Sequence, residues 1–310
     1  MPELSIILPF HNESSGAALL FERLYPVLGS LQLDYEIICI DDGSTDNTYD
    51  TLRHERDKDR RVKIVRMARN FGKEAALACG LHFAKGHAAI TMDSDLQHPP
   101  EAIRELVQKW HDGGQLIYAV RRNRKGENFI YRMFARAFYA VFRRIAEVKI
   151  PEGAGDFCLL DRIVIDAVNA LPERNRFMKG LVSWVGFRRD TVTFDVEPRQ
   201  GGASSWNFFR LLRFAFDGLS AFSTLPLRIW TWSGALVSFA ALGYALYLIL
   251  DTLLYGVDVP GFASVMVGIL FLGGLQLLSL GMIGEYLARV ITEVKARPLY
   301  FIAERDGFEA

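Results

Sequence analysis

The chain has 310 residues, and 36 Lys and Arg residues balance 36 Asp and Glu residues, so its formal net charge at pH 7 is zero. This balance excludes the broad basic surface of a protein whose main partner is a nucleic acid. The three cysteines are too few and too far apart for a disulfide framework or a zinc site, which favours reduced thiols in the cytosol.

The N-terminal part of the chain alternates short apolar runs with stretches of helical pattern. The runs predict strands at 4–9, 35–42, 62–65, 88–93 and 115–120, and the stretches between them predict helices at about 14–30, 46–57, 73–85 and 100–112. Asp46 and the Pro99–Pro100 pair are typical of helix starts. Buried apolar strands that alternate with helices predict an α/β fold with a mostly parallel sheet covered on both faces.

Polar side chains follow every one of these predicted strands. In strand order they are Pro9, Asn12 and Glu13, then Asp41 and Asp42, then Arg69, Asn70 and Lys73, then Asp93 and Asp95, and finally Arg121 and Arg122. Ligands of parallel sheets bind outside the carboxyl ends of the strands, where all of these groups are expected to meet. The sequence therefore predicts one binding site at this edge.

Asp93 and Asp95 stand two positions apart, where like charges repel each other unless a positive group lies beside them. A divalent cation is one such group, because Mg²⁺ binds one or two carboxylates together with substrate phosphates, and Gln97 offers a further oxygen. Two helix-capping aspartates before Pro99 are the alternative. The cation is favoured because Asp41 and Asp42 are expected at the same edge, which would otherwise lack a counter-ion.

Half of the residues are hydrophobic, and two C-terminal runs, 229–250 and 259–284, contain no charged residue. Each run exceeds the about 20 residues that cross a membrane, so both are predicted to be transmembrane helices, with buried helices of a soluble protein as the alternative. The connection between them carries Asp251 and Asp258 and no Lys or Arg, whereas Arg228, Arg289, Lys295 and Arg297 flank the pair. The positive-inside rule then predicts a multi-pass protein of the inner membrane, with both termini and the N-terminal region in the cytoplasm.

Two further stretches, 129–147 and 206–222, keep their charged residues on one helical stripe and are otherwise apolar and aromatic. Their wide apolar faces and their position before the spans favour helices that lie in the membrane surface. Ordinary amphipathic helices packed on a soluble core are the alternative.

Six motifs occur along the chain in a fixed order: LPFHNE (8–13), DDGSTD (41–46), RNFGKEAAL (69–77), DSDLQHPPE (93–101), GDF (155–157) and RFMKG (176–180). With the paired spans and the ending GEYLARVITEVKARPLY (284–300), they resemble inverting family 2 glycosyltransferases over nearly the whole chain. The closest resemblance is to the branch that loads a sugar onto a polyprenyl phosphate, which includes GtrB-type bactoprenol glucosyltransferases and dolichyl-phosphate mannose synthases.

The resemblance implies a Rossmann-like GT-A fold in four parts. Residues 1–125 would bind the nucleotide sugar, 126–226 would form the acceptor side with the interface helices, 227–290 would hold both transmembrane helices, and 291–310 would be a cytoplasmic tail. It also implies Mg²⁺ or Mn²⁺ as the cofactor, bound by Asp93, Asp95 and Gln97.

The same resemblance implies roles for individual residues. The nucleotide sugar would be bound by Pro9, Asn12, Glu13, Asp41, Asp42, Lys73, Asp93 and Ser94, and the lipid phosphate by Arg121, Arg122, Arg136, Arg199 and Ser205. Asp156, Asp95 and Arg122 would be the catalytic residues. Ser205 departs from the family, because relatives commonly have a lysine there, so a nearby arginine would have to replace that charge or phosphate would bind more weakly.

Asp156 matches the aspartate that is often named as the family's catalytic base. The acceptor is a phosphate monoester, whose second pKa of about 6 leaves it mostly dianionic at neutral pH, so little remains for a base to remove. We therefore expect Asp156 to position an arginine or the substrate hydroxyls. A turn residue within GAGDF is the alternative.

The expected reaction transfers glucose from UDP-glucose to undecaprenyl phosphate at the cytoplasmic face, by analogy with the glucosyl branch. GDP-mannose or a modified sugar remains an alternative donor, and a membrane-anchored nucleotide-sugar sensor is the non-enzyme alternative. A processive synthase is disfavoured because no Q-x-x-R-W motif occurs, and a transporter because the spans are few and carry no ionisable residue. Membrane lipid, a separate flippase, a downstream glycosyltransferase and a second copy of the chain are the expected partners.

Overall fold

The computed structural model describes residues 2–121, 151, 153–174, 176–195 and 261–308, with short pieces between 233 and 254. The chain divides into two compact units, one of Met1–Leu219 with Arg297–Ala310 and one of Ser220–Ala296. Arg122, Arg136, Arg199 and Ser205 lie outside the described residues, as do the two amphipathic stretches, so the predictions made for them are not tested.

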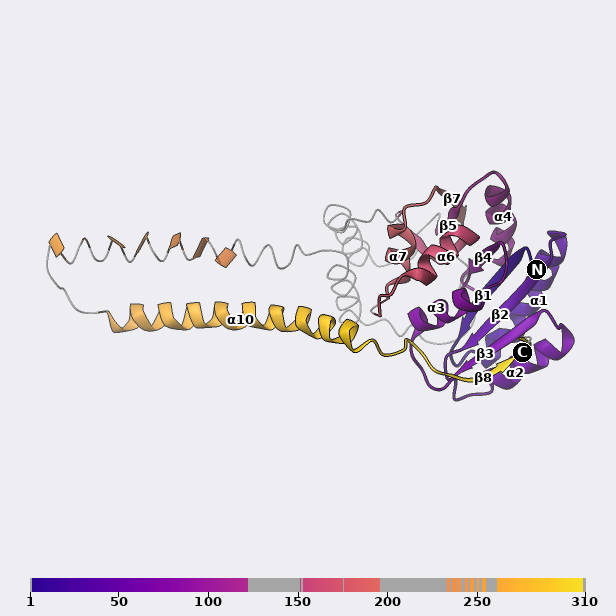
Figure 1. Ribbon diagram of the computed structural model, residues 1–310, viewed down its shortest axis with the longest axis horizontal. Coiled ribbons are helices and arrows are strands. Elements are labelled where there is room, and N and C mark those ends of the chain that lie inside the picture. Colours follow the sequence, from indigo (N-terminus) through magenta and orange to yellow (C-terminus); the bar gives the residue numbers. More distant parts are fainter. Residues whose placement is uncertain are drawn as a thin grey trace. The chain divides into compact units, whose positions relative to one another are not determined.

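The first unit is built on a sheet that has eight strands within the described residues, in the order β7-β5-β6-β4-β1-β2-β3-β8 (Figure 1). Their bounds are β1 (Leu4–Phe10), β2 (Tyr35–Asp41), β3 (Val62–Met67), β4 (Ala88–Thr91), β5 (Leu116–Arg121), β6 (Ala154–Asp161), β7 (Arg189–Phe194) and β8 (Ile302–Asp306). β1 is parallel to β2 and β4, as β2 is to β3 and β5 is to β7, whereas β6 and β8 run antiparallel to their neighbours. The predicted α/β fold with a mostly parallel sheet is confirmed.

Helices cover both faces of this sheet. Their bounds are α1 (Ser14–Ser30), α2 (Thr48–Lys58), α3 (Lys73–Phe83), the 3₁₀ turn η1 (Pro100–Ala102), α4 (Ile103–His111), α6 (Arg162–Ala170) and α7 (Met178–Trp184). Contacts group α1, α2 and α4 on one face, and α3, α6 and α7 on the other (Figure 1). The prediction of a helix start at Pro99–Pro100 is confirmed, and α2 begins just after Asp46, whose Oδ1 accepts a hydrogen bond from the Thr48 backbone N at 3.0 Å.

The core between β1 and α1 shows why the sequence folds in this way. Leu4, Ile6 and Leu8 belong to the same buried cluster as α1, while Ser5 and Ile7 between them are also fully buried, as expected of a strand covered on both faces. Leu20, Leu24 and Leu28 recur every four residues along α1 and are also fully buried, which matches one face of a helix. Each such side chain contributes about 1.5–3 kcal/mol when it leaves water, so this interface stabilises the packing of α1 on β1.

The chain reverses its direction across the sheet at β1. From β1 it proceeds to β2 and β3, and then it returns to β4 on the other side of β1. In open α/β sheets, ligands bind in the crevice outside the carboxyl ends of the strands at such a reversal. The segments that follow β1 and β4 therefore define the binding edge.

β6 brings a second part of the chain to the same edge, because it pairs antiparallel with β4 and places Cys158 opposite Thr91. Asp156 therefore lies in a strand beside the end of β4, and its alternative interpretation as a turn residue is wrong. Two glycines in GAGDF are typical of a turn, but the pairing of β6 with both β4 and β5 overrides that local preference.

The second unit contains α10 (Phe262–Lys295). Within the described residues, Phe271–Lys295 is the one stretch of helix that is long and apolar enough to cross a membrane, with a mean hydropathy of 1.3. It overlaps the second predicted span. The first predicted span, 229–250, is largely outside the described residues, although its described pieces are helical, so the pair of spans stays a prediction.

Candidate functional site

Asp42 fixes the loop that precedes α3. Its Oδ1 accepts a hydrogen bond from the backbone N of Phe71 at 2.7 Å, and its Oδ2 accepts one from the backbone N of Gly72 at 2.9 Å. The side chain is buried, so backbone amides compensate its charge. Asp42 thus ties the end of β2 to the loop after β3, which leaves it little capacity for a ligand.

Asp41 is the other aspartate at the end of β2, and it is fully buried. Its Oδ1 accepts from the Ser44 backbone N at 3.0 Å, and its Oδ2 lies 3.5 Å from Arg66 Nε. That Oδ2 has no hydrogen-bond partner among the described residues. A buried acceptor without a hydrogen-bond donor is costly, and the charge of Arg66 offsets part of that cost.

Polar contacts also join the loops after β1, β2 and β3. Asn12 has a left-handed backbone conformation, and its Oδ1 accepts from the Thr45 backbone N at 2.9 Å. Asn70 Nδ2 donates to His11 Nε2 at 2.9 Å, which leaves His11 Nδ1 to donate to the Asp42 backbone O at 2.9 Å. The three loops thus form one surface. The backbone N of Glu13 also donates to Thr48 Oγ1, which joins the loop after β1 to the start of α2.

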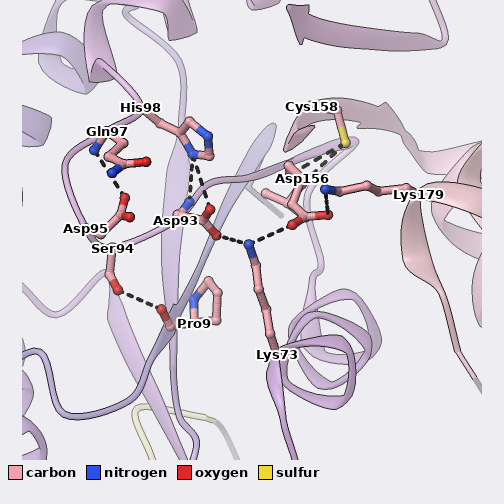
Figure 2. Close-up of polar contacts among 11 residues, drawn as sticks. Pro9, Lys73, Asp93, Ser94, Asp95, Gln97, His98, Asp156, Cys158 and Lys179 are labelled. Atoms are coloured by element: carbon pink, nitrogen blue, oxygen red, sulfur yellow. Dashed lines mark hydrogen bonds and ion pairs between the residues drawn. The ribbon is translucent and has the colours of Figure 1, made fainter. Parts of the chain in front are cut away.

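Lys73 lies at the centre of the site and joins two carboxylates (Figure 2). Its Nζ is 2.5 Å from Asp93 Oδ1 and 2.6 Å from Asp156 Oδ2. On the far side, Lys179 Nζ is 3.6 Å from Asp156 Oδ1. We refer to Lys73, Asp93, Asp156 and Lys179 as the charge bridge. It connects the loop after β4 with β6 and with α7.

The charges of the bridge are fixed by one another. Burial alone would raise the pKa of Asp156, but Lys179 and Lys73 outweigh burial and lower that pKa to about 2. Burial alone would lower the pKa of Lys73, but Asp93 and Asp156 raise it above its usual value. Asp156 and Lys73 are therefore both ionised at neutral pH, and the Asp156 carboxylate is a weak base.

His98 supports the loop that carries Asp93. Its Nδ1 accepts a hydrogen bond from the Asp93 backbone N at 3.2 Å, and its ring stacks on Phe157 with centroids 5.0 Å apart. Burial lowers the pKa of His98, so the ring is neutral and keeps its acceptor nitrogen. Ser94 Oγ donates to the Pro9 backbone O at 2.9 Å, which attaches the same loop to β1.

Asp95 and Gln97 lie on this loop, with the Gln97 backbone N donating to Asp95 Oδ1 at 3.1 Å (Figure 2). Among the described residues, no group of three His, Cys, Asp or Glu side chains could hold a metal ion. The oxygen donors of Asp93, Asp95 and Gln97 nevertheless fit Mg²⁺ or Mn²⁺, because such ions take one or two protein carboxylates and complete their shell with substrate phosphate and water.

The sequence predicts that Asp41, Asp42, Asp93 and Asp95 repel one another at this edge without a counter-ion, and this reason for a cation is wrong. In the structure Asp41 lies beside Arg66, and Asp42 accepts from two backbone amides. Asp93 contacts Lys73, and Asp95 accepts from the Gln97 backbone N. The metal prediction therefore depends on the donor atoms and not on uncompensated charge.

Arg121 is the last residue of β5, and the preceding Val120 pairs with Ala154, two residues before Asp156 in β6. Sequence reasoning missed Lys179, His98 and Glu74, although all three lie within the motifs quoted for the family. Glu74 Oε2 accepts from the Met178 backbone N at 2.7 Å, and burial together with Asp156 raises the pKa of Glu74 to about 7.

Known proteins with similar sequences agree with this architecture. Residues 5–168 match glycosyl transferase family 2, and residues 225–290 match the GtrB C-terminal hairpin. The chain is 53% identical over 307 residues to an uncharacterized glycosyltransferase of Synechocystis sp., covering 99% of this chain and 96% of that protein. It is 39% identical over 300 residues to the SfII prophage-derived bactoprenol glucosyl transferase of Shigella flexneri, covering 97% of each.

A solved structure shows the same fold. Glucosyl-3-phosphoglycerate synthase from Mycobacterium tuberculosis in complex with phosphoglyceric acid matches with a TM-score of 0.50 at 19% identity, over 71% of this chain and 79% of that chain. This likeness extends to the Rossmann-like GT-A sheet and not to the chemistry. Because the family match spans more than half of the sequence and the relatives match over nearly their full lengths, the chain belongs to glycosyltransferase family 2 and carries a GtrB C-terminal hairpin.

Proposed function

We propose that the protein transfers a sugar from a nucleoside diphosphate sugar to a polyprenyl phosphate, with inversion at the anomeric carbon. The observation that carries the proposal is the charge bridge, in which Lys73 joins Asp93, in the loop after β4, to Asp156 in β6. Full-length relatives named bactoprenol glucosyl transferases favour glucose as the sugar and undecaprenyl phosphate as the acceptor.

The nucleotide would bind in the crevice outside β1 and β2. Asp41 lies at the end of β2 in this crevice, and its Oδ1 accepts from the Ser44 backbone N, which fixes the loop that follows. The backbone N of Asn12 donates to Ser44 Oγ in the loop after β2, and Ser94 Oγ donates to the Pro9 backbone O. We therefore assign Pro9, Asn12, Glu13 and Ser94 to the nucleotide sugar together with Asp41. UDP-glucose is the proposed donor, with GDP-mannose or a modified sugar as the alternative.

The leaving diphosphate would lie beside the loop after β4. Asp95 and Gln97, together with Asp93, would hold Mg²⁺ or Mn²⁺ there, and such an ion neutralises the negative charge that develops on the diphosphate. Lys73 contacts Asp93 and so fixes the position of this carboxylate beside the diphosphate. Charges that are already in position when the reaction begins are a major source of rate enhancement.

The reaction itself would be a single displacement. An oxygen of the acceptor phosphate forms a bond to the anomeric carbon from one face while the bond to the diphosphate breaks on the other, which inverts the configuration. No proton has to leave an acceptor that is already dianionic. Asp156, with its pKa lowered to about 2, is too weak a base for that purpose, so we assign it to the positioning of Lys73 and Lys179.

The acceptor requires a site near a membrane. Its lipid phosphate would be bound by Arg121 and by Arg122, Arg136, Arg199 and Ser205, which lie outside the described residues. α10 is the described segment suited to cross the membrane. The same proposal includes two membrane spans with both termini in the cytoplasm and transfer of the sugar to the lipid at the cytoplasmic face. It also includes a separate flippase, a downstream glycosyltransferase and self-association.

The test is sugar transfer by the purified protein in detergent, supplied with undecaprenyl phosphate, Mg²⁺ or Mn²⁺ and a labelled panel of UDP- and GDP-sugars. One donor is expected to give an extractable glycolipid, and the product is expected to disappear with EDTA and in Asp95→Ala. Asp112→Ala changes an exposed aspartate at the end of α4 and is the matched control. Saturable nucleotide-sugar binding with no lipid product from any donor would reject the transferase and favour the sensor.

A further inference from the structure

The two lysines of the charge bridge differ in how firmly they are held. Lys73 Nζ makes two short contacts, at 2.5 Å with a carboxylate oxygen in the loop after β4 and at 2.6 Å with one in β6. Lys179 Nζ lies 3.6 Å from Asp156 Oδ1, beyond hydrogen-bond distance, and that buried oxygen has no hydrogen-bond partner among the described residues. Lys179 is therefore attracted to Asp156 by charge but not locked to it.

We propose that Lys179 binds the phosphate of the acceptor, and that Asp156 holds the Lys179 ammonium group in place until the phosphate arrives. The inference rests on the proposed transferase function and names a substrate contact that the family motifs left without a role. Lys179 is a substrate-binding residue in this account, and Asp156 acts through it.

The balance of charge selects Lys179 over Lys73. A phosphate dianion that approaches Asp156 is repelled unless a cation stands between them. The positive charge of Lys73 is shared by two carboxylates at short distance, so little attraction remains for a third anion. The charge of Lys179 faces Asp156 at a longer distance, and its side chain is 25% exposed, so a substrate can reach it.

A contact between α3 and α7 fixes the position of Lys179. It is in the first turn of α7, next to Met178, whose backbone N donates to Glu74 Oε2 at 2.7 Å. Glu74 follows Lys73 in α3, so one helix positions both lysines on the two sides of Asp156 (Figure 2). The hollow between Asp156, Lys179 and Met178 measures about 20 Å³, room for one water and not for phosphate, so the acceptor would approach from the exposed side of Lys179.

Phosphate at this site could belong to the acceptor or to the donor's diphosphate, and kinetics separate the two. The variants are Lys179→Gln, the conservative Lys179→Arg, and Lys109→Gln as the matched control. Lys109 lies in α4, on the other face of the sheet from α7, and pairs with Asp190 of β7. Lys179→Gln is expected to raise the KM for polyprenyl phosphate about tenfold or more, the usual effect of losing a charge-assisted hydrogen bond. The KM for the nucleotide sugar is expected to stay within about twofold, and Lys179→Arg is expected to recover most of the loss.

A second readout needs no turnover. Calorimetric binding of a short-chain prenyl phosphate is expected in the wild type and in Lys109→Gln, and is expected to weaken in Lys179→Gln. That result would support the inference even if the wild type transferred no sugar, which would reject the proposed function alone. A rise in the nucleotide-sugar KM, or a lower kcat with prenyl phosphate binding unchanged, would overturn the assignment to the acceptor.

Discussion

Lys73 Nζ lies 2.6 Å from Asp156 Oδ2, and this ion pair connects α3 with β6 across the end of the sheet. The same ammonium group contacts Asp93, which follows β4. One side chain therefore links the carboxylates of two segments, the loop after β4 and strand β6. The pair is an element of the site's geometry as well as of its charge.

Replacing Lys73 with methionine tests this role. Lys73→Met leaves Asp93 and Asp156 to repel each other, and we expect the transfer rate to fall by roughly 10²-fold or more, the effect of misplacing reacting groups by about 1 Å. The Lys73 side chain is 41% exposed, so solvent screening limits the loss of stability to about 1–2 kcal/mol. Turnover and thermal unfolding are measured beside Lys109→Met, and wild-type turnover in Lys73→Met would show that the bridge is not needed.

The pH–rate profile of Asp156→Asn separates positioning from base catalysis. Two lysines lower the pKa of Asp156 to about 2, so in the wild type this group stays ionised, and the profile is expected to show no step from it at neutral pH. Asp156→Asn is expected to be slower with a profile of the same shape. A mutant rate that became first-order in hydroxide below about pH 6, where the second pKa of the acceptor lies, would restore the base role.

The pKa of Glu74 predicts a pH dependence of stability with a definite sign. Burial and Asp156 raise this pKa from 4.5 to about 7, so between these values the folded state keeps a proton that the unfolded state has lost. The free energy of unfolding therefore falls as the pH rises through this window. Glu74→Gln keeps an acceptor for the Met178 backbone N but does not titrate, so its stability relative to the wild type is expected to increase by about 1–3 kcal/mol from pH 5 to pH 8.

Thermal unfolding at several pH values measures this difference. Glu74→Ala is the comparison, because it removes the charge and also the acceptor of Met178 N, and it is expected to be less stable than Glu74→Gln throughout. Parallel curves for Glu74→Gln and the wild type would mean that Glu74 titrates near its ordinary pKa.

The sequence predicted the first five strands because each is an apolar run followed by a helical pattern. β7 and β8 lack that signal: RDTVTF and IAERD are short and carry charged residues, which are typical of strands at the edge of a sheet. Their assignment depends on pairing with β5 and β3, which lie far away in the sequence. The local sequence pattern does not indicate which distant strand will pair with these segments.

The residues of the site were predictable from the sequence, but their contacts with one another were not. Sequence reasoning gathered Asp41, Asp42, Asp93 and Asp95 at one edge, since strand ends are readable from the pattern. It could not tell which carboxylate faces which cation, because the contacts of Lys73 join residues 20 and 83 positions apart along the chain. Lys179 stayed without a role for the same reason, as its place beside Asp156 depends on the contact between Glu74 and α7.

Gly43 offers a test of how closely the loops of the nucleotide side are packed. Its φ is +62°, and a Cβ atom there would lie 2.4 Å from the backbone C of Arg69, so Gly43→Ala must displace the loop after β3. We expect a loss of about 2 kcal/mol or more in the free energy of unfolding and weaker nucleotide-sugar binding, because Asp42 can no longer hold the amides of Phe71 and Gly72.

Gly29→Ala is the control: in the described structure a Cβ at this position of α1 meets no atom within 4 Å, and the change is expected to stabilise the helix by about 0.5–1 kcal/mol. Thermal unfolding and calorimetric binding measure both variants. Equal unfolding temperatures and equal nucleotide affinity for Gly43→Ala and the wild type would mean that the loops after β2 and β3 have room between them, and that Asp42 does not set the shape of the nucleotide side.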